Sequence, residues 1–549
     1  MDQENFAYGY IRDAVHSKAE DFHLDSLIKG GAIIDGLGTP QYSTNLGIEG
    51  DTIAYVGKEE PGASEVIDAR NLVVSPGFID IHTHVDTWLL RDPAQEERLS
   101  QGVTAVVVGN CGFSAAPILP GRESFVRDAI PIFVEVAWNW RSVDEYLKRL
   151  SERELAINGG MLVGHSTVRL NVMGVEKREP TKKELDQIKG LVEKAMTDGA
   201  FGLSSGLIYV PGIYSKTNEL IELCKVVAKN GGIYTSHIRG EAGTLMRAVQ
   251  EAMQIGRVAK VPVEVSHHKA VGRDNWGRVK DTLRMIDEAK EAGVEVNCDV
   301  YPYAAGNTGL GTLIPTWVFT DGPLKAKERI TGPLRSQIIR EMLTKATDEE
   351  RPLVETGAEN IVISYCKESP SLEGKTLTEI AKMHNSTPAE TVLDLVLEHG
   401  CVMHSVLIIL FEMSEDDVRT VIRHPLSMIA SDSVNPMGKP HPRVYGTYTR
   451  VLAKYVREEK VLTLEEAVRK MTSMPARKLG LKDRGVINVG NKADLVIFDP
   501  DTVRDKATFP DPTQISEGIE YVFVNGKKAW EKMKTTGARA GVVLRHSLW

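Results

Sequence analysis

Two histidines separated by one residue, His82 and His84, form the first pattern in this chain that could do chemistry. Alternate residues of a β-strand point to the same face, so two imidazoles with this spacing can meet one cation. By itself the pair is equally compatible with two hydrogen-bonded histidines in a turn. Its position after a Pro-Gly turn and an apolar, strand-like run favours a metal site.

Two further histidines stand at the ends of apolar runs, His237 in YTSHIRGE and His267 in EVSHHK. A lone histidine in such a place is more often structural than a ligand, but four histidines at three strand ends are harder to explain in that way. Neutral imidazole suits zinc and similar cations. The neighbouring His268 should face the other side of its strand, so His267 is the preferred ligand.

Cys111 and Asp432 also stand at the ends of apolar runs. A thiolate is a strong zinc ligand, although a single cysteine is more often a small buried hydrophobe. Its position between Asn110 and Gly112 favours the ligand. A carboxylate such as Asp432 can serve as general base and then general acid beside a metal ion. The alternative is a turn or N-cap aspartate, which is common in Ser-Asp-Ser; the histidine set favours the catalytic interpretation.

Three more side chains could hold a substrate: Tyr209 in GLSSGLIYVPG, Lys269 two residues after His267, and Arg443 in KPHPRVYG. Two cations and a phenol would suit a carboxylate, which arginine can bind in a bidentate manner. Spacing alone favours the plainer interpretation, in which these are surface charges and a packed aromatic ring.

The elements that position these residues are eight apolar segments, most of them near-continuous as in parallel strands buried on both faces. Helical patterns fall between several of them, for example at 181–198 and 277–293. Eight such units predict an α/β fold, a (β/α)₈ TIM barrel whose polar residues lie at the carboxyl ends of the strands. The segments are 77–84, 103–110, 160–165, 201–207, 232–238, 262–269, 295–303 and 427–433.

Both ends of the chain are β-rich, which predicts one small β domain, of sandwich type, built from residues 26–76 and 485–549. Asn525-Gly526 is a strong hairpin signal within it. Residues 1–25 are an N-terminal extension of weak helical character, and residues 77–484 form the catalytic barrel. The segment 304–426 is too long for an ordinary connection and is interpreted as an insertion that could cover the site.

Composition excludes several classes of function. The net charge is −9 and no strong basic run appears, so nothing supports a nucleic-acid partner. Five scattered cysteines are typical of reduced thiols in a cytoplasmic protein. The N-terminus has no apolar region of a secretory signal, and no run of about 18 apolar residues predicts a membrane span. The oligomeric state cannot be derived from these features.

The ordered motifs resemble the D-aminoacylase (N-acyl-D-amino-acid deacylase) branch of the amidohydrolase superfamily, from about residue 26 to 535. One position departs from that pattern, because Ala430 and Ser433 stand where glycines are usual around Asp432. The motifs that carry the resemblance are PGFIDIHTH, VVGNCGFS, GHSTVR, GLIYVPG, SHIRGE, SHHK, DVYPYAAGNT, MSEDDVR, ASDS, HPRVYGTYTRVLAKYVRE and ADLVIFDPDTVRDKATF.

The resemblance implies a β-sandwich-like domain with a TIM barrel, and hydrolysis of an N-acyl-D-amino acid, a small-molecule substrate, to a carboxylate and a D-amino acid. It also implies roles for the residues singled out above. Asp432 would be the catalytic acid and base. The tight zinc site would be Cys111, His237 and His267; the second, weaker site His82 and His84; and the substrate carboxylate site Tyr209, Lys269 and Arg443.

Three other functions remain open. A cyclic amidase of the dihydroorotase or hydantoinase kind would use the same barrel, but the context of Cys111 and the lack of a convincing bridging lysine in GLSSGL argue against it. A deaminase shares the His-x-His pair and the aspartate of the eighth strand. A non-catalytic assembly protein on this fold would be expected to lose ligands, and here the set is complete.

Overall fold

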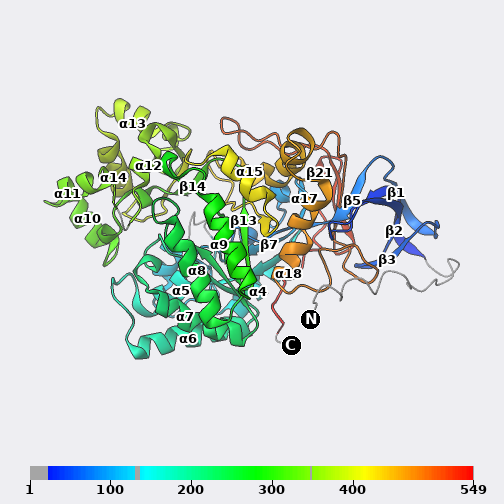
Figure 1. The fold of residues 1–549 in the computed structure, drawn as a ribbon, viewed down its shortest axis with the longest axis horizontal. Coiled ribbons are helices and arrows are strands. Elements are labelled where there is room, and N and C mark those ends of the chain that lie inside the picture. Colours follow the sequence, from blue (N-terminus) through cyan, green and yellow to red (C-terminus); the bar gives the residue numbers. More distant parts are fainter. Residues whose placement is uncertain (1–22, 130–135, 347–348, 548–549) are drawn as a thin grey trace.

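The computed structural model describes residues 23–129, 136–346 and 349–547. Most of the predicted N-terminal extension, residues 1–22, therefore lies outside the described residues. Along the longest axis of the molecule, strands β1 (Leu24–Ile33), β2 (Tyr42–Glu49) and β3 (Thr52–Gly57) lie at one end and a group of helices from about residue 320 to 400 lies at the other (Figure 1). Between them stands the layer of strands and helices that carries the predicted site residues.

Each of the eight predicted strand segments contains a strand, and these strands pair in parallel in two sheets, β6-β7-β8 and β9-β10-β11-β12-β13-β17. Leu162 alone separates β8 from β9, so the two are parts of one predicted segment. Nearly all of their residues are buried, as expected where both faces of a parallel sheet are covered. The strands are β6 (Phe78–Asp80), β7 (Val103–Val108), β8 (Asn158–Met161), β9 (Val163–Gly164), β10 (Gly202–Gly206), β11 (Ile233–His237), β12 (Val263–Val265), β13 (Val296–Val300) and β17 (Ser427–Ile429).

The first and last of these strands also meet. The Asp432 N–H donates to the His82 carbonyl at 2.9 Å, and the His84 N–H donates to the Ser433 carbonyl at 2.8 Å. The Ser431 N–H donates to the carboxylate of Asp80 at 3.0 Å. The residues that follow β6 are therefore fixed directly against those that follow β17.

Helices follow the strands and pack side by side along the sheet, α6 against α7, α7 against α8 and α8 against α9. The α6 helix begins where the sequence predicts, because the Thr181 side chain accepts the Glu184 N–H and the Glu184 carboxylate accepts the Thr181 N–H. These helices are α6 (Lys182–Thr197), α7 (Thr217–Lys229), α8 (Leu245–Ala259), α9 (Val279–Glu291) and α15 (Glu415–Arg423).

Shorter helices complete this layer at its two ends. Before α6 come α1 (Trp88–Arg91), α2 (Glu96–Leu99), α3 (Glu123–Ala129), α4 (Val143–Ser151) and α5 (His165–Met173). After β17 come α16 (Arg443–Arg450), a π-helix (Val451–Glu458), α17 (Leu464–Met471) and α18 (Ser473–Lys478).

Both chain ends share a nine-stranded sheet, in which β5 pairs antiparallel with β18. The predicted hairpin is present, since Asn525 and Gly526 have φ of 45° and 75°, the left-handed backbone that Asn-Gly turns favour. Beyond the sheet, the Leu544 N–H donates to the Gly159 carbonyl, so the last described residues run along β8. The remaining strands are β4 (Ala63–Asp68), β5 (Val73–Pro76), β18 (Leu495–Phe498), β19 (Ile519–Val524), β20 (Lys527–Glu531) and β21 (Lys534–Thr535).

The long segment after β13 has its own hydrophobic core, which continues into Cys111, Phe113 and Tyr209 at the strand ends. Its strands form a separate antiparallel sheet in the order β14-β16-β15. The α15 helix packs instead on α9 and β17, so this separate packing ends before residue 415. The elements are β14 (Gly306–Gly309), α10 (Pro323–Thr331), α11 (Arg335–Met342), α12 (Pro352–Thr356), β15 (Ile361–Cys366), α13 (Leu377–Met383), α14 (Pro388–Glu398) and β16 (Val406–Leu410).

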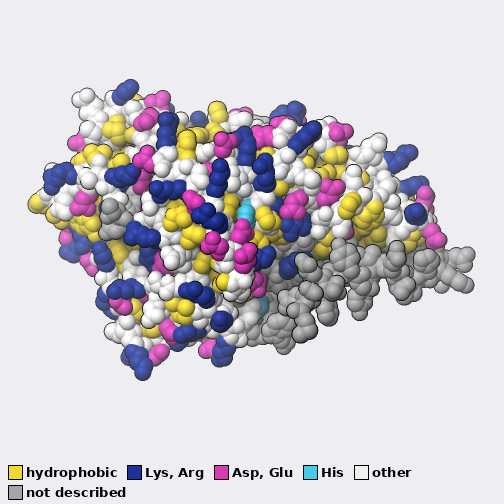
Figure 2. Space-filling view, viewed as in Figure 1, with side chains coloured by type: hydrophobic (Ala, Val, Ile, Leu, Met, Phe, Trp, Pro, Cys, Tyr) yellow, Lys and Arg dark blue, Asp and Glu magenta, His cyan; other side chains and the backbone are white. Residues whose placement is uncertain are grey.

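The surface in Figure 2 carries lysine, arginine, aspartate and glutamate side chains intermixed on the face shown. Among the described residues, no helix combines the length and the apolar character that a membrane span requires. All five cysteines are buried and free of disulfide bonds.

Candidate metal centre

The three predicted ligands of the tight site come together above the carboxyl ends of β7, β11 and β12. The Cys111 Sγ lies 3.4 Å from the His267 Nε2, and the His237 and His267 ring centroids are 4.4 Å apart. One ligand atom from each of the three residues fits within 4.8 Å of the other two. This spacing is that of side chains able to share one ion.

His237 supplies an independent test of whether a metal fits here. The residue is only 4% exposed, and neither of its ring nitrogens has a hydrogen-bond partner in the described part of the chain. Buried polar atoms are nearly always paired because an unpaired one loses its hydration without compensation. A cation bound between Cys111, His237 and His267 would provide the missing partner, so the donor set fits zinc.

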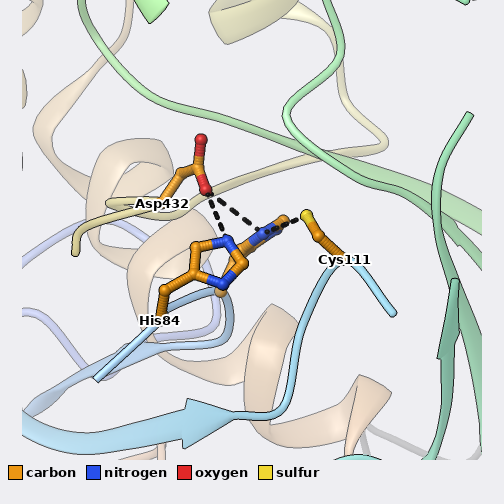
Figure 3. Close-up of side chains that lie close together, drawn as sticks. His84, Cys111 and Asp432 are labelled. Atoms are coloured by element: carbon orange, nitrogen blue, oxygen red, sulfur yellow. Dashed lines mark hydrogen bonds and ion pairs between the residues drawn. The ribbon is translucent and has the colours of Figure 1, made fainter. Parts of the chain in front are cut away.

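A second group shares Cys111 and consists of His82, His84 and Asp432. The Cys111 Sγ lies 3.3 Å from the His82 Nε2, and the Asp432 Oδ1 lies 3.1 Å from the His84 Nε2 and 3.4 Å from the His82 Nε2. Figure 3 shows the Asp432 carboxylate pointing to the His84 ring and the Cys111 thiol facing the same space. The two candidate ion positions are therefore neighbours with one common ligand.

Electrostatics favours the ionised forms of Cys111 and Asp432. Burial alone would raise both pKa values, but the surrounding charges outweigh it. His82, His267 and His84 bring the pKa of Cys111 well below its ordinary value, and a thiolate is the form that binds metal. Arg443, His267 and His82 bring the pKa of Asp432 well below its ordinary value, so Asp432 is a carboxylate able to accept a proton.

Three of these residues have left-handed backbone, with φ of 50° at Cys111, 36° at His267 and 48° at Asp432. Such a conformation costs a non-glycine residue of the order of 1–2 kcal/mol. The chain turns sharply away from the strand at each of these positions, which is why β12 stops at Val265 although the sequence predicts a strand through residue 269. Strain of this kind is concentrated at functional sites.

The fourth strand brings no side chain into this space at its end. A β-carbon added to Gly206 would lie 2.1 Å from the Cys111 carbonyl oxygen. The backbone after β7 therefore occupies the volume into which a side chain on the last residue of β10 would project. This close approach accounts for the glycine at the end of GLSSG and excludes a metal-bridging lysine at position 206.

Lys269 and Arg443 face the same aromatic ring, that of Tyr301, at 5.7 and 4.6 Å. The Lys269 Nζ binds the Glu241 Oε1 at 2.7 Å. The Arg443 side chain is fully buried and one of its terminal nitrogens lies 2.9 Å from the Asp432 Oδ2. None of its guanidinium nitrogens makes a hydrogen bond among the described residues. Arg443 thus holds Asp432 by charge and keeps donors available for another acceptor.

Tyr209 lies on the other side of the metal ligands. Its ring is 4.9 Å from that of His237, and its hydroxyl is 3.2 Å from the Thr308 Oγ1 in the insertion. Tyr209 and Lys269 both line the cavity that lies over the metal ligands. Arg443 is not among its lining residues and lies behind the wall. The structure therefore brings the three predicted substrate residues to one centre, but only two of them to its open space.

Asp299 and Glu241 belong to the centre and were not singled out from the sequence. Asp299 contacts two ligands, since its Oδ2 lies 3.1 Å from the His82 Nδ1 and its Oδ1 accepts the His267 N–H at 2.8 Å. The Glu241 Oε1 lies 3.0 Å from the His267 Nδ1. Asp299 lies within the predicted strand 295–303 and Glu241 lies three residues after the predicted strand 232–238; neither position alone marks a functional carboxylate.

The model of the amidohydrolase family matches residues 65–233 and 335–529 of this chain. The D-aminoacylase of Alcaligenes xylosoxydans xylosoxydans is 37% identical over 529 residues, which cover 96% of this chain and 99% of that protein. The dihydroorotase of Geotalea daltonii is more distant, with 23% identity over 492 residues. This chain therefore spans nearly the whole length of its more similar relative.

Two solved structures agree with that result. The N-acyl-D-glutamate deacylase from Bordetella bronchiseptica, solved with zinc and a phosphonate mimic of the tetrahedral intermediate, is 36% identical with a TM-score of 0.81, and the match covers 96% of this chain and 100% of that chain. A second solved structure is a D-aminoacylase, reported with a binuclear metal centre, one-metal activation and second-metal attenuation. It is also 36% identical with a TM-score of 0.81, and the match covers 95% of this chain and 100% of that chain.

Proposed function

Because this chain belongs to the amidohydrolase family, we propose that it hydrolyses the amide bond of N-acyl-D-amino acids to a carboxylate and a D-amino acid with the help of zinc. The observation that carries the proposal is the convergence of five metal-binding side chains and Asp432 in two adjoining groups, with no hydrogen-bond partner for the ring nitrogens of His237 among the described residues. Relatives named D-aminoacylase and N-acyl-D-glutamate deacylase support this substrate class.

Cys111, His237 and His267 would hold the tightly bound zinc, and His82 and His84 a second, weaker ion. Zinc bound at such a site supplies a Lewis acid that polarises a carbonyl and lowers the pKa of water. The chain's own contribution is to keep Cys111 ionised and to orient the imidazole rings through contacts to the ring nitrogens that do not bind metal. Asp299 orients His82 through its Nδ1, which leaves the Nε2 facing Cys111 and Asp432.

Asp432 would be the general base and then the general acid. Its carboxylate is ionised and lies within 3.4 Å of both His82 and His84, so it can accept a proton from the attacking water. The same group then returns the proton to the leaving amine. The Arg443 charge holds the carboxylate in place throughout.

The substrate carboxylate would bind to Tyr209, Lys269 and Arg443. The support is the position of Lys269 and of the Tyr209 phenol on the cavity wall, with Arg443 directly behind that wall and its guanidinium donors unused by the described residues. Holding the carboxylate at several points orients the amide against the metal centre and limits the configuration that fits. In this geometry the amino-acid part of the substrate lies beside Lys269.

The proposal also covers the architecture of the chain. The contacts between the residues after β6 and β17 support closure of the eight parallel strands into a (β/α)₈ barrel at 77–484. The sheet shared by both chain ends supports a small β domain of residues 26–76 and 485–549, although its last described residues run along β8. The insertion begins at about 304, and its separate core supports an end near residue 413 rather than 426. A cytoplasmic location is supported by the five free cysteines.

The alternative cyclic amidase is disfavoured by the distant dihydroorotase match and by the lack of space at Gly206. A direct test assays the purified protein, with and without added zinc, on N-acetyl-D- and N-acetyl-L-amino acids, a dihydropyrimidine and a hydantoin. The proposal expects zinc-dependent release of D-amino acids only. Activity confined to L-substrates or cyclic amides, or release of ammonia, would refute it, and a zinc-loaded protein inert on every substrate would support the assembly role instead.

A further inference from the structure

Three glutamates from separate segments line the cavity: Glu241 after β11, Glu350 before α12 and Glu412 after β16. Lys269 is the only lysine or arginine among the described residues that line it, and Lys269 is already bound to Glu241 at 2.7 Å. No lysine or arginine of the described cavity wall is therefore left to balance Glu350 and Glu412 when they ionise.

Glu412 is the best placed of these groups to meet a ligand. Its side chain is buried, with 8% exposure. The Thr356 hydroxyl at 3.5 Å from the Oε2 is its only side-chain hydrogen bond, and no described residue pairs with the Oε1. Its backbone is fixed, because the Glu412 carbonyl accepts the Gly272 N–H at 2.9 Å and the Trp276 indole N–H at 3.1 Å. The Oε1 is thus held in the wall without a partner.

The surroundings keep space open beside this oxygen. A β-carbon on Gly306, which also lines the cavity, would lie 2.6 Å from the Glu412 Oε1. Any larger residue at position 306 would fill the approach to the carboxylate. Glu350 is fixed from the other side, because its Oε1 accepts the backbone N–H groups of Glu241 and Ala242.

The pKa values of both carboxyls report the missing countercharge. Burial, with Glu241 and Glu355 nearby, raises the pKa of Glu350 to about 8. Burial also raises the pKa of Glu412 to about 8. The charges of Glu241 and Glu355 raise this pKa further, and the charge of Lys269 lowers it. A ligand that carries a positive charge into this part of the cavity would stabilise the ionised carboxylates.

A metal ion does not fit this requirement. The groups of described residues that converge closely enough to ligate one ion are the two at the strand ends, and neither includes Glu350 or Glu412. An organic cation with several hydrogen-bond donors can instead reach carboxylates that are spread along a wall. The ligand chemistry is therefore an ammonium or guanidinium group.

We propose that the substrate is an N-acyl-D-amino acid with a cationic side chain, of the lysine or arginine type, whose cation binds Glu412 with Glu350 adding negative charge. This inference rests on the proposed function and specifies its substrate. Lys269 lies within electrostatic range of Glu412 and belongs to the proposed carboxylate site, so Glu412 is on the amino-acid side of the cavity. Phe113 and Val434 supply apolar lining for the acyl group.

The test compares kcat/KM for N-acetyl-D-lysine and N-acetyl-D-norleucine, which differ in the terminal charged group, with N-acetyl-D-glutamate as the acidic counterpart. At pH 9, where Glu412 is mostly ionised, the wild-type zinc enzyme should prefer lysine over norleucine by about tenfold or more, the range of one hydrogen bond to a charged group. Glutamate should be the poorest of the three. In Glu412→Gln the lysine-to-norleucine ratio should fall by about tenfold.

Glu355→Gln is the matched control, because Glu355 adds charge nearby but does not line the cavity. Its ratio should stay within about twofold of wild type, as for a screened charge. A wild-type preference for norleucine, or an unchanged ratio in Glu412→Gln, overturns the inference while leaving the deacylase intact. Faster cleavage of glycyl-D-norleucine than of N-acetyl-D-lysine overturns it too, since the cation would then belong to the acyl part. Failure to cleave any N-acyl-D-amino acid would refute the proposed function itself.

Discussion

The strand-end wall (Cys111, His237, His267, Lys269 and Asp432) and the insertion wall (Asn307, Thr308, His404, Leu407 and Glu412) enclose one cavity but hold their polar groups differently. On the strand-end wall the side chains contact one another, with the Lys269 Nζ 2.7 Å from Glu241 and the Cys111 Sγ 3.4 Å from His267, and three of them have strained backbone; the ring nitrogens of His237, which pair with no described residue, face the proposed metal position. On the insertion wall a carboxylate oxygen of Glu412 and the His404 Nε2 have no partner among the described residues. The comparison indicates that the chemistry is built into the strand ends and the selectivity into the insertion.

The largest effect is expected on the strand-end wall, at Asp432. Asp432→Ala removes the proposed proton carrier and should lower kcat by about 10³-fold or more on every substrate, within the range of general acid–base catalysis. Zinc content should stay near that of wild type, because the tight ligands are unchanged. Steady-state kinetics and metal analysis of the same preparation check both expectations. Turnover close to wild type would refute the assignment of Asp432.

The next effect separates the two candidate ion positions. Cys111→Ala removes the ligand common to both groups and should leave the purified protein without retained zinc. His84→Ala should keep the tight zinc, because His84 contacts only the second group. Metal analysis after dialysis measures the difference, and zinc addition should raise the Tm of His84→Ala but not of Cys111→Ala, since ligands that bind only the native state stabilise it. Equal zinc retention in both variants would contradict the division into two sites.

Asp299 provides a smaller test of the strand-end wall. Asp299→Asn keeps the volume but weakens the hold on His82 and on the His267 backbone. Loss of such a supporting carboxylate should reduce zinc affinity by about 10–100-fold, as measured by chelator competition. Asp287→Asn is the control, because Asp287 is half exposed and pairs with His424 on the surface. If both variants bind zinc like wild type, Asp299 does not position the ligands.

The difference between the walls also explains what the sequence could reveal. Apolar segments ending in His237 or Cys111 predict both the strands and the ligands, because parallel strands bring their carboxyl ends together. Local strand and turn signals such as Asn525-Gly526 predicted a small β domain of sandwich type from both chain ends, and the structure joins these ends in one nine-stranded sheet. These features depend on periodicity and local backbone preference, which a single sequence contains.

Other features depend on tertiary contacts that local signals do not report. Glu412 follows an apolar strand as Asp432 does, yet only packing of the insertion against the parallel strands brings it into the cavity. Asp299 is one of several polar residues in EVNCDVYPY, and only the fold shows that it contacts two ligands. The buried position of Arg443 behind Asp432 likewise follows from the packing of α16 and was not predicted.

The smallest expected effect is the pH dependence of selectivity on the insertion wall. The pKa of Glu412 is raised to about 8, so its carboxyl is mostly neutral at pH 7 and mostly ionised at pH 9. Preference for N-acetyl-D-lysine over N-acetyl-D-norleucine should therefore rise with pH by up to about tenfold, the change in ionised fraction over that range. Of the charged groups nearby, Glu241 has a lowered pKa and Lys269 a raised one, so both keep their charge across this window, whereas Glu350, with a pKa raised to about 8, titrates within it. Measuring the ratio of kcat/KM cancels the shared titration of the metal centre, and most of the rise should be lost in Glu412→Gln, because Glu412 contacts the cation and Glu350 only adds charge. A ratio that is flat with pH in wild type, or that rises equally in the variant, would place selectivity on the strand-end wall and remove the contrast between the two.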